Sequence, residues 1–235
     1  MTLAEDFLTR RPWPRLILID LDGTLVDSAP DLAFCVDAML ERLGRPPEGE
    51  ARVRHWVGNG VERLVRRALT GQLDGEPSET EFQSALPLFE AFYAARPCQD
   101  SRLYPGVRSG LEALARMGYR LGCVTSKAAR YALPLLEALG IAGFFELIVA
   151  GDSLPRQKPD PLPLLHAARH FGVEPPEALM VGDSISDVQA ARAAGFTIVC
   201  MSYGYNHGQD IRLTRPDGVI DSLVALPEWL EKRTA

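Results

Sequence analysis

The stretch RLILIDLDGT, residues 15–24, decides the fold of this chain. Four consecutive apolar residues precede Asp20, which is typical of a strand buried on both faces, as in a parallel sheet. Residues two apart in an extended chain point the same way, so Asp20 and Asp22 are expected to face a single site. That site would lie beyond the carboxyl end of the strand, where open parallel sheets bind their ligands.

Gly23 would allow the backbone to turn sharply after this strand and to present N–H groups at the same place. An Asp-Gly pair is also typical of the turn that closes a β-hairpin. We favour the ligand site, because helix signals rather than a partner strand follow residue 24.

Short apolar runs of the same kind alternate with helical patterns along the chain. We expect strands over residues 15–20, 120–125, 146–150, 178–183, 197–201 and 218–220. Helices are expected over residues 106–117, 127–139, 161–171 and 184–194, each followed by a glycine that suits a helix C-cap. This alternation predicts an α/β fold with a Rossmann-like parallel sheet core and helices on both faces.

Residues 28–98 interrupt the alternation, because they contain helical patterns without a convincing strand. Helices are expected from about residue 28 to residue 43, over 61–69 and over 79–95. The length of 235 residues corresponds to roughly one and a half typical domains. We therefore expect a core of residues 1–27 and 99–235, with residues 28–98 forming a small inserted helical cap domain.

Composition limits the partners and the location. The 25 Lys and Arg residues against 31 Asp and Glu give a net charge of −6, which argues against nonspecific binding to nucleic acid or acidic membranes. The four cysteines are scattered without a CxxC pair, which favours a reduced, cytoplasmic protein. Glu5 and Asp6 stand where a signal peptide would be basic, and no apolar run could span a membrane. We expect a monomer or homodimer without nucleic acid or membrane partners.

A second pair of carboxylates follows another apolar run. Asp183 stands at the end of the strand expected over residues 178–183, and Asp187 lies one turn into the next helix. They could serve only as parts of a helix N-cap. Because the strands of a parallel sheet end at one edge, we expect them instead to meet Asp20 and Asp22. Hard oxygen ligands in this number, without a Cys or His cluster, favour Mg²⁺ over zinc.

Two other strand ends carry complementary groups. Thr125 and Ser126 offer hydroxyls beside the N-terminus of an expected helix, a place where anions bind. Lys158 lies in the proline-stiffened loop QKPDP, residues 157–161, and could hold a positive charge in place. Taken alone, Thr125 would more often be a helix cap and Lys158 a surface lysine.

These groups together suit phosphoryl transfer. A carboxylate cannot attack a phosphate dianion unless the negative charge is screened, and Mg²⁺ with Lys158 would supply that screening. Hydroxyl and backbone N–H groups would hold the phosphoryl oxygens. One carboxylate could then act as nucleophile and another as general acid and base.

Four segments resemble the motifs of the haloacid dehalogenase-like superfamily in order and spacing. They are DLDGT at 20–24, the strand end at Thr125, Lys158 in KPDP, and GDSISD at 182–187. The helical block resembles the small cap of that superfamily. Three further segments resemble its bacterial phosphoglycolate phosphatases: RHWVGNG at 54–60, LYPGV at 103–107 and YGYNHG at 203–208. The resemblance extends from about residue 15 to 230.

Carried over to this sequence, the resemblance implies a hydrolase in which Asp20 is the nucleophile and Asp22 the general acid and base. Mg²⁺ would be held by Asp20, the main-chain carbonyl of Asp22, and Asp183. Asp187 would be a direct or an outer ligand. An acid two residues after the nucleophile, here Asp22, distinguishes the phosphatases of the superfamily from its dehalogenases.

The same resemblance implies that Thr125 binds the phosphoryl group and that Lys158 balances charge. The substrate is further expected to contact Gly23, Thr24, Ser126 and, from the cap, Asn59. The loop around Asn59 could instead be a plain turn between helices. Ser126 and Ser186 stand where many relatives have Asn, and we expect altered contacts there rather than loss of activity.

The expected activity is Mg²⁺-dependent hydrolysis of a small phosphorylated metabolite, and the resemblance implies 2-phosphoglycolate as that substrate. A sugar phosphatase, a pyrophosphatase or a phosphosugar mutase would use the same core. A non-catalytic phosphate-binding module is a further alternative, which is disfavoured because all four motif positions carry competent residues.

Overall fold

The computed structural model describes residues 13–96 and 98–234. Six strands are assembled into one sheet: Leu16–Ile19 (β1), Leu121–Val124 (β4), Leu147–Val149 (β5), Ala178–Gly182 (β6), Thr197–Met201 (β7) and Gly218–Ile220 (β8). Their order is β5-β4-β1-β6-β7-β8, and every neighbouring pair is parallel. The α/β fold with a parallel sheet is therefore confirmed.

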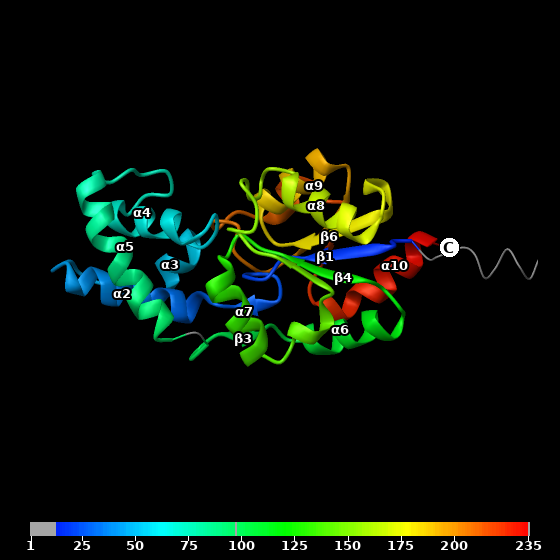
Figure 1. The fold of residues 1–235 in the computed structure, drawn as a ribbon, viewed down its shortest axis with the longest axis horizontal. Coiled ribbons are helices and arrows are strands. Elements are labelled where there is room, and N and C mark those ends of the chain that lie inside the picture. Colours follow the sequence, from blue (N-terminus) through cyan, green and yellow to red (C-terminus); the bar gives the residue numbers. More distant parts are fainter. Residues whose placement is uncertain (1–12, 97, 235) are drawn as a thin grey trace, which may run out of the picture.

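Helices cover both faces of this sheet (Figure 1). One face carries Val107–Arg116 (α6), Ala129–Ala138 (α7) and Leu226–Thr234 (α10), and the other carries Leu162–Phe171 (α8) and Ile185–Ala194 (α9). In β1, Leu16 and Leu18 pack toward α8 and α9, whereas Ile17 and Ile19 pack toward the opposite helices. Burial of both faces explains why the strand is apolar throughout rather than alternating.

Four helices form a second group beyond one end of the sheet (Figure 1). They are Ala29–Arg42 (α2), Glu50–Trp56 (α3), Val61–Thr70 (α4) and Glu79–Ala94 (α5), packed around a separate apolar cluster. The helix α3 was not predicted from the sequence, because its seven residues make fewer than two turns and so show little periodicity. The helix α10 was not predicted either.

Two chain crossings join the helical group to the sheet. Val26–Asp27 (β2) pairs antiparallel with Arg102–Leu103 (β3), a pairing that the sequence analysis did not predict. Buried Asp31 accepts hydrogen bonds from the N–H groups of Asp100 and Ser101 and from the Ser101 hydroxyl. These bonds hold the returning chain against the first turn of α2.

Within the described residues, no helix is both long and apolar enough to cross a membrane. All four cysteines are free, in agreement with their scattered spacing. Residues 1–12, which include the acidic positions used in the prediction about a signal peptide, lie outside the described residues.

Candidate active site

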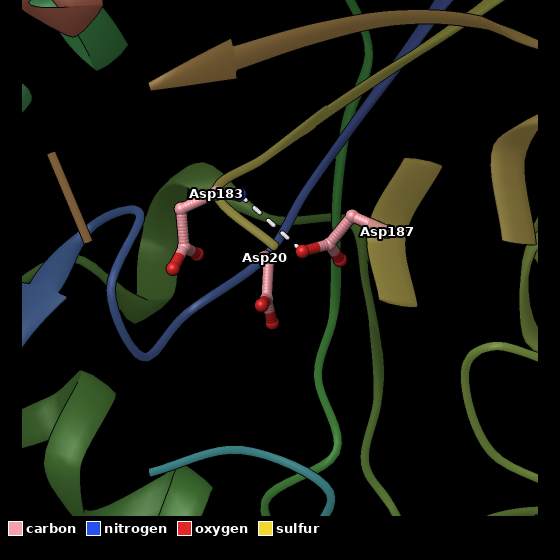
Figure 2. Close-up of side chains that lie close together, drawn as sticks. All are labelled: Asp20, Asp183 and Asp187. Atoms are coloured by element: carbon pink, nitrogen blue, oxygen red, sulfur yellow. Dashed lines mark hydrogen bonds between the residues drawn. The ribbon is translucent and has the colours of Figure 1, made fainter. Parts of the chain in front are cut away.

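Three buried carboxylates from neighbouring strands come together at the carboxyl edge of the sheet. Asp20 follows β1, Asp183 follows β6, and Asp187 lies in the first turn of α9. One oxygen from each of the three lies within 4.8 Å of the others. Figure 2 shows the three side chains lying close together. Topology thus brings the acidic groups of the first and fourth motifs to one place.

Lys158 supplies a buried positive charge to this cluster. Its Nζ atom lies 2.6 Å from Oδ1 of Asp187 and 2.9 Å from Oδ1 of Asp20, and its side chain is 3% exposed. Burial alone would lower the pKa of the lysine, but Asp187 and Asp20 raise it above its ordinary value. The ammonium therefore remains charged at neutral pH.

The carboxylates nevertheless outnumber the cation. Burial raises the pKa of Asp20 to about 7, although Lys158 opposes this shift and the charge of Asp187 adds to it. Burial, Asp187 and Asp20 also raise the pKa of Asp183 well above its ordinary value. Among the described residues, Oδ1 of Asp20 has no hydrogen-bond partner, and its 2.9 Å contact with Lys158 Nζ is an ion pair. An excess of hard oxygen donors, one of them unsatisfied, fits a divalent metal ion.

Asp187 accepts more hydrogen bonds from the described residues than either of the other two carboxylates. Oδ2 accepts hydrogen bonds from the N–H groups of Asp183 and Ser184 and from the Ser184 hydroxyl. Oδ1 accepts from Lys158. These contacts form the capping box that begins α9. Asp187 therefore caps the helix and also orients Lys158.

Gly23 and Thr24, which we expected to contact the substrate, lie against Asp183 and support it. The Thr24 hydroxyl is fully buried and donates to Oδ1 of Asp183 at 2.6 Å, while the Gly23 N–H donates to the carbonyl of Val26. Gly23 has a φ of +87°, and a Cβ atom there would lie 2.3 Å from Oδ2 of Asp183. Glycine is needed at this turn so that the turn can pack under the carboxylate.

Asp22 faces the cavity from the same turn and is held by two donors. Lys127 Nζ donates to its two carboxylate oxygens at 2.9 and 3.0 Å, and the Ser28 hydroxyl donates at 2.6 Å. The sequence analysis did not single out Lys127, because it placed this residue in the first turn of a helix. The helix α7 in fact begins at Ala129. The available signal was the position of Lys127 in a strand-end loop.

Thr125 and Ser126 line the cavity at the end of β4. The Thr125 hydroxyl accepts a hydrogen bond from the N–H of Lys127. The N-terminus of α7, which we expected to offer an anion site, is occupied by the protein itself, because Asp152 accepts from the Ala129 N–H at 2.8 Å. A carboxylate satisfies the same preference for negative charge at a helix N-terminus. The first N–H group of α7 is therefore engaged by Asp152, while Thr125 and Ser126 of the strand-end loop line the cavity.

The strand ends and the loop between α3 and α4 enclose a cavity of about 70 Å³. Asn59 forms part of its wall, and its Nδ2 donates to Oγ of Ser186 at 3.2 Å, from the helical group to the core. The loop is thus more than a turn between helices. From the core, the lining includes Asp20, Asp22, Thr125, Ser126, Lys127, Lys158 and Asp183.

The loop after β7 adds two residues whose roles were not predicted. The Tyr205 N–H donates to Oδ2 of Asp183 at 2.6 Å, and its hydroxyl donates to Oδ1 of Asp27 at 2.6 Å. His207 also lines the cavity, and its Nδ1 lies 2.8 Å from the carbonyl oxygen of His55. This loop therefore connects the carboxylate cluster with β2 and with α3.

Comparison with known proteins assigns the architecture to a family. The model for haloacid dehalogenase-like hydrolases matches residues 14–195. The chain belongs to the haloacid dehalogenase-like hydrolases. This membership confirms the resemblance inferred from the four motifs and identifies the protein as a hydrolase of that family.

Relatives of this haloacid dehalogenase-like hydrolase share most of its length. The phosphoglycolate phosphatase of Nitrosococcus oceani is 60% identical over 219 residues, covering 93% of this chain and 97% of the relative. That of Nitrosospira multiformis is 47% identical, with 93% and 96% covered. A crystal structure of a predicted phosphoglycolate phosphatase from Haemophilus somnus is similar with a TM-score of 0.86 at 39% identity, covering 92% and 97% of the two chains.

Proposed function

We propose that this hydrolase is a Mg²⁺-dependent phosphatase that converts 2-phosphoglycolate to glycolate and inorganic phosphate. The observation that carries the proposal is the buried cluster of Asp20, Asp183 and Asp187 beside Lys158, with Asp22 lining the same cavity. Hydrolysis through a covalent intermediate requires a nucleophile, a proton-transfer group and compensation of charge, and this arrangement offers all three. The names of the two relatives support 2-phosphoglycolate as the substrate.

The reaction would take two steps. First, the Asp20 carboxylate forms a bond to phosphorus while the ester P–O bond breaks, and Asp22 gives its proton to the leaving glycolate oxygen. Second, Asp22 takes a proton from a water molecule whose oxygen attacks the phosphorus of the aspartyl-phosphate. The bond between Asp20 and phosphorus then breaks and phosphate leaves. Thr125 and Ser126 would hold the phosphoryl oxygens, and Lys158 would balance their charge.

Asp20, Asp183 and the main-chain carbonyl of Asp22 would hold the metal ion. When bound, Mg²⁺ would neutralise negative charge on the carboxylates and on the phosphoryl oxygens. Asp187 would act from outside this set, since Oδ1 pairs with Lys158 and Oδ2 already accepts three hydrogen bonds at the start of α9.

The helical residues 28–98 would be a cap domain that selects the leaving group and excludes water, above a core of residues 1–27 and 99–235. Their separate apolar cluster supports this division, as does the contribution of Asn59 to the cavity wall. The free cysteines support a reduced, cytoplasmic protein.

A phosphate-release assay over a panel of esters, with and without Mg²⁺, tests the proposal. The panel contains 2-phosphoglycolate, ethyl phosphate, glucose 6-phosphate, glucose 1-phosphate and pyrophosphate. We expect the highest kcat/KM for 2-phosphoglycolate and strong stimulation by Mg²⁺. Preference for a hexose phosphate would contradict 2-phosphoglycolate as the substrate but would leave the proposed phosphate hydrolysis intact. Isomerisation without phosphate release would indicate a mutase. Absence of Mg²⁺-stimulated turnover on every phosphomonoester would reject the enzyme assignment.

A further inference from the structure

Arg67 of α4 is a buried cation that the two proposed steps do not use. Only 5% of the residue is exposed. In the part of the chain that the structure describes, its guanidinium donates only to uncharged groups, namely the carbonyls of Trp56, Gly58 and Leu73 and the side-chain oxygen of Asn59. Burial lowers its pKa to about 10, so it is protonated at neutral pH.

Arg67 determines which end of the Asn59 amide faces the core. A guanidinium has N–H donors and no acceptor, so only Oδ1 of Asn59 can meet Nη2, at 3.0 Å. The Nδ2 end must then point the other way, where it donates to Ser186 Oγ at the cavity wall. Rotation of the amide by 180° would place its NH₂ group against the N–H groups of Arg67.

Arg67 also orients the backbone of the loop. Nη1 lies 2.7 Å from the carbonyl oxygen of Trp56 and 3.0 Å from that of Gly58. Because the C=O and N–H groups of a trans peptide point in opposite directions, the Asn59 N–H points away from the guanidinium. Residues 58–60 all have positive φ, a conformation that glycine and asparagine adopt more readily than other residues.

We propose that Arg67 is a positioning residue that makes this loop a hydrogen-bond donor toward the leaving group, and so selects phosphate esters whose leaving group carries an anionic oxygen. The inference rests on the proposed function, in which the leaving glycolate bears a carboxylate. The buried positive charge behind the loop adds attraction for that carboxylate. Arg63, one turn earlier on α4, has a different role, because it pairs with Glu76 and Asp74 in the following loop.

The test is the ratio of kcat/KM for 2-phosphoglycolate to kcat/KM for ethyl phosphate, which keeps the two-carbon leaving group and lacks the carboxylate. The wild-type ratio is expected to be well above one. In Arg67→Met it should fall about tenfold or more, mainly through KM for 2-phosphoglycolate, because the amide of Asn59 becomes free to rotate. The matched control Arg63→Met is expected to keep the wild-type ratio.

Since Arg67→Met removes several buried hydrogen bonds, Asn59→Asp provides an independent variant. It keeps an acceptor for Arg67 and replaces the donor facing the leaving group by a negatively charged oxygen. The ratio should fall about a hundredfold, with thermal melting to verify the fold. A wild-type ratio in Asn59→Asp, or in folded Arg67→Met, would overturn the inference and leave the phosphatase assignment standing. A ratio near one in the wild type would overturn both the inference and the substrate.

Discussion

The Nζ atom of Lys127 lies 2.9 and 3.0 Å from the two carboxylate oxygens of Asp22. This pair connects the ends of β4 and β1, and the two side chains are only 3% and 17% exposed. The Ser28 hydroxyl donates to the same carboxylate at 2.6 Å. The proposed proton-transfer group is thus held in one orientation from two sides.

Replacing Lys127 by Met should lower kcat about 10- to 100-fold, because Asp22 loses two of the hydrogen bonds that orient it. The free energy of unfolding should fall by about 3 kcal/mol, since a largely buried carboxylate keeps only its hydroxyl partner. Steady-state kinetics and urea unfolding measure the two effects. Lys127→Arg preserves the charge and should retain most of the stability. An unchanged kcat in Lys127→Met would show that Asp22 does not depend on this pair.

Asp20→Asn should abolish turnover and should also change how stability depends on pH. Burial raises the pKa of Asp20 to about 7, whereas an unfolded aspartate has a pKa of about 4. Between these values the unfolded state loses its proton and the folded state retains it, so the folded protein loses stability as the pH rises. In EDTA, the wild-type Tm should therefore fall from about pH 4 to about pH 7 more steeply than that of Asp20→Asn.

Added Mg²⁺ should reverse much of this loss in the wild type, because an ion that binds only the folded state stabilises it. Thermal melts of both proteins across the pH range, with EDTA and with Mg²⁺, make the comparison. Identical pH dependence of the two proteins in EDTA would contradict the assignment of the pKa to Asp20.

Thr24→Val should weaken metal binding without touching a metal ligand. The Thr24 hydroxyl donates to Oδ1 of Asp183 at 2.6 Å, and valine keeps the shape while removing the donor. Loss of such an outer contact typically lowers metal affinity about tenfold or more. The Mg²⁺ concentration for half-maximal activity and for half-maximal thermal stabilisation should both rise. Thr24→Ser keeps a hydroxyl and is the matched control; the same weakening in both variants would point to packing rather than to the hydrogen bond.

Arg54 of α3 should contribute stability that disappears in acid. It donates to both oxygens of Asp27 at 2.9 and 3.0 Å, and the Tyr205 hydroxyl donates to the same group. Although burial opposes the shift, these hydrogen bonds lower the pKa of Asp27. A lowered carboxyl pKa adds stability above the unfolded pKa of about 4, and this stability is lost as the pH falls through the folded pKa.

Arg54→Met is accordingly expected to lose about 1 kcal/mol at neutral pH, a small value because both side chains are partly exposed to solvent. Its difference from the wild type should shrink below about pH 4, as measured by urea unfolding at several pH values. Arg54→Lys preserves the charge and serves as control. A difference that persists unchanged in acid would assign the effect to packing of the arginine on Tyr205 instead.

Two short strands and the start of α7 were not predicted correctly, for physical reasons that the structure shows. The strand β2 has two residues and pairs with β3, which lies after the whole helical group, so neither strand shows a period or a nearby partner. The start of α7 was placed two residues early, because the sequence does not show that Lys127 turns back toward Asp22. The N-terminus of the same helix was predicted to be free to bind an anion. Its partner Asp152 follows a later strand, so the sequence does not show that the two meet.

The sequence by itself determined the parallel sheet and the strand ends from which Asp20, Asp183 and Lys158 reach a common edge. The apolar runs that form the strands can be read directly from the sequence. The geometry of parallel strands then places their carboxyl ends at one edge of the sheet. Only the tertiary structure decided the partners of each group. Lys127 meets Asp22 across 105 residues of chain, and Thr24 meets Asp183 across 159. Such contacts depend on long-range packing and side-chain rotamers, which local sequence patterns do not encode.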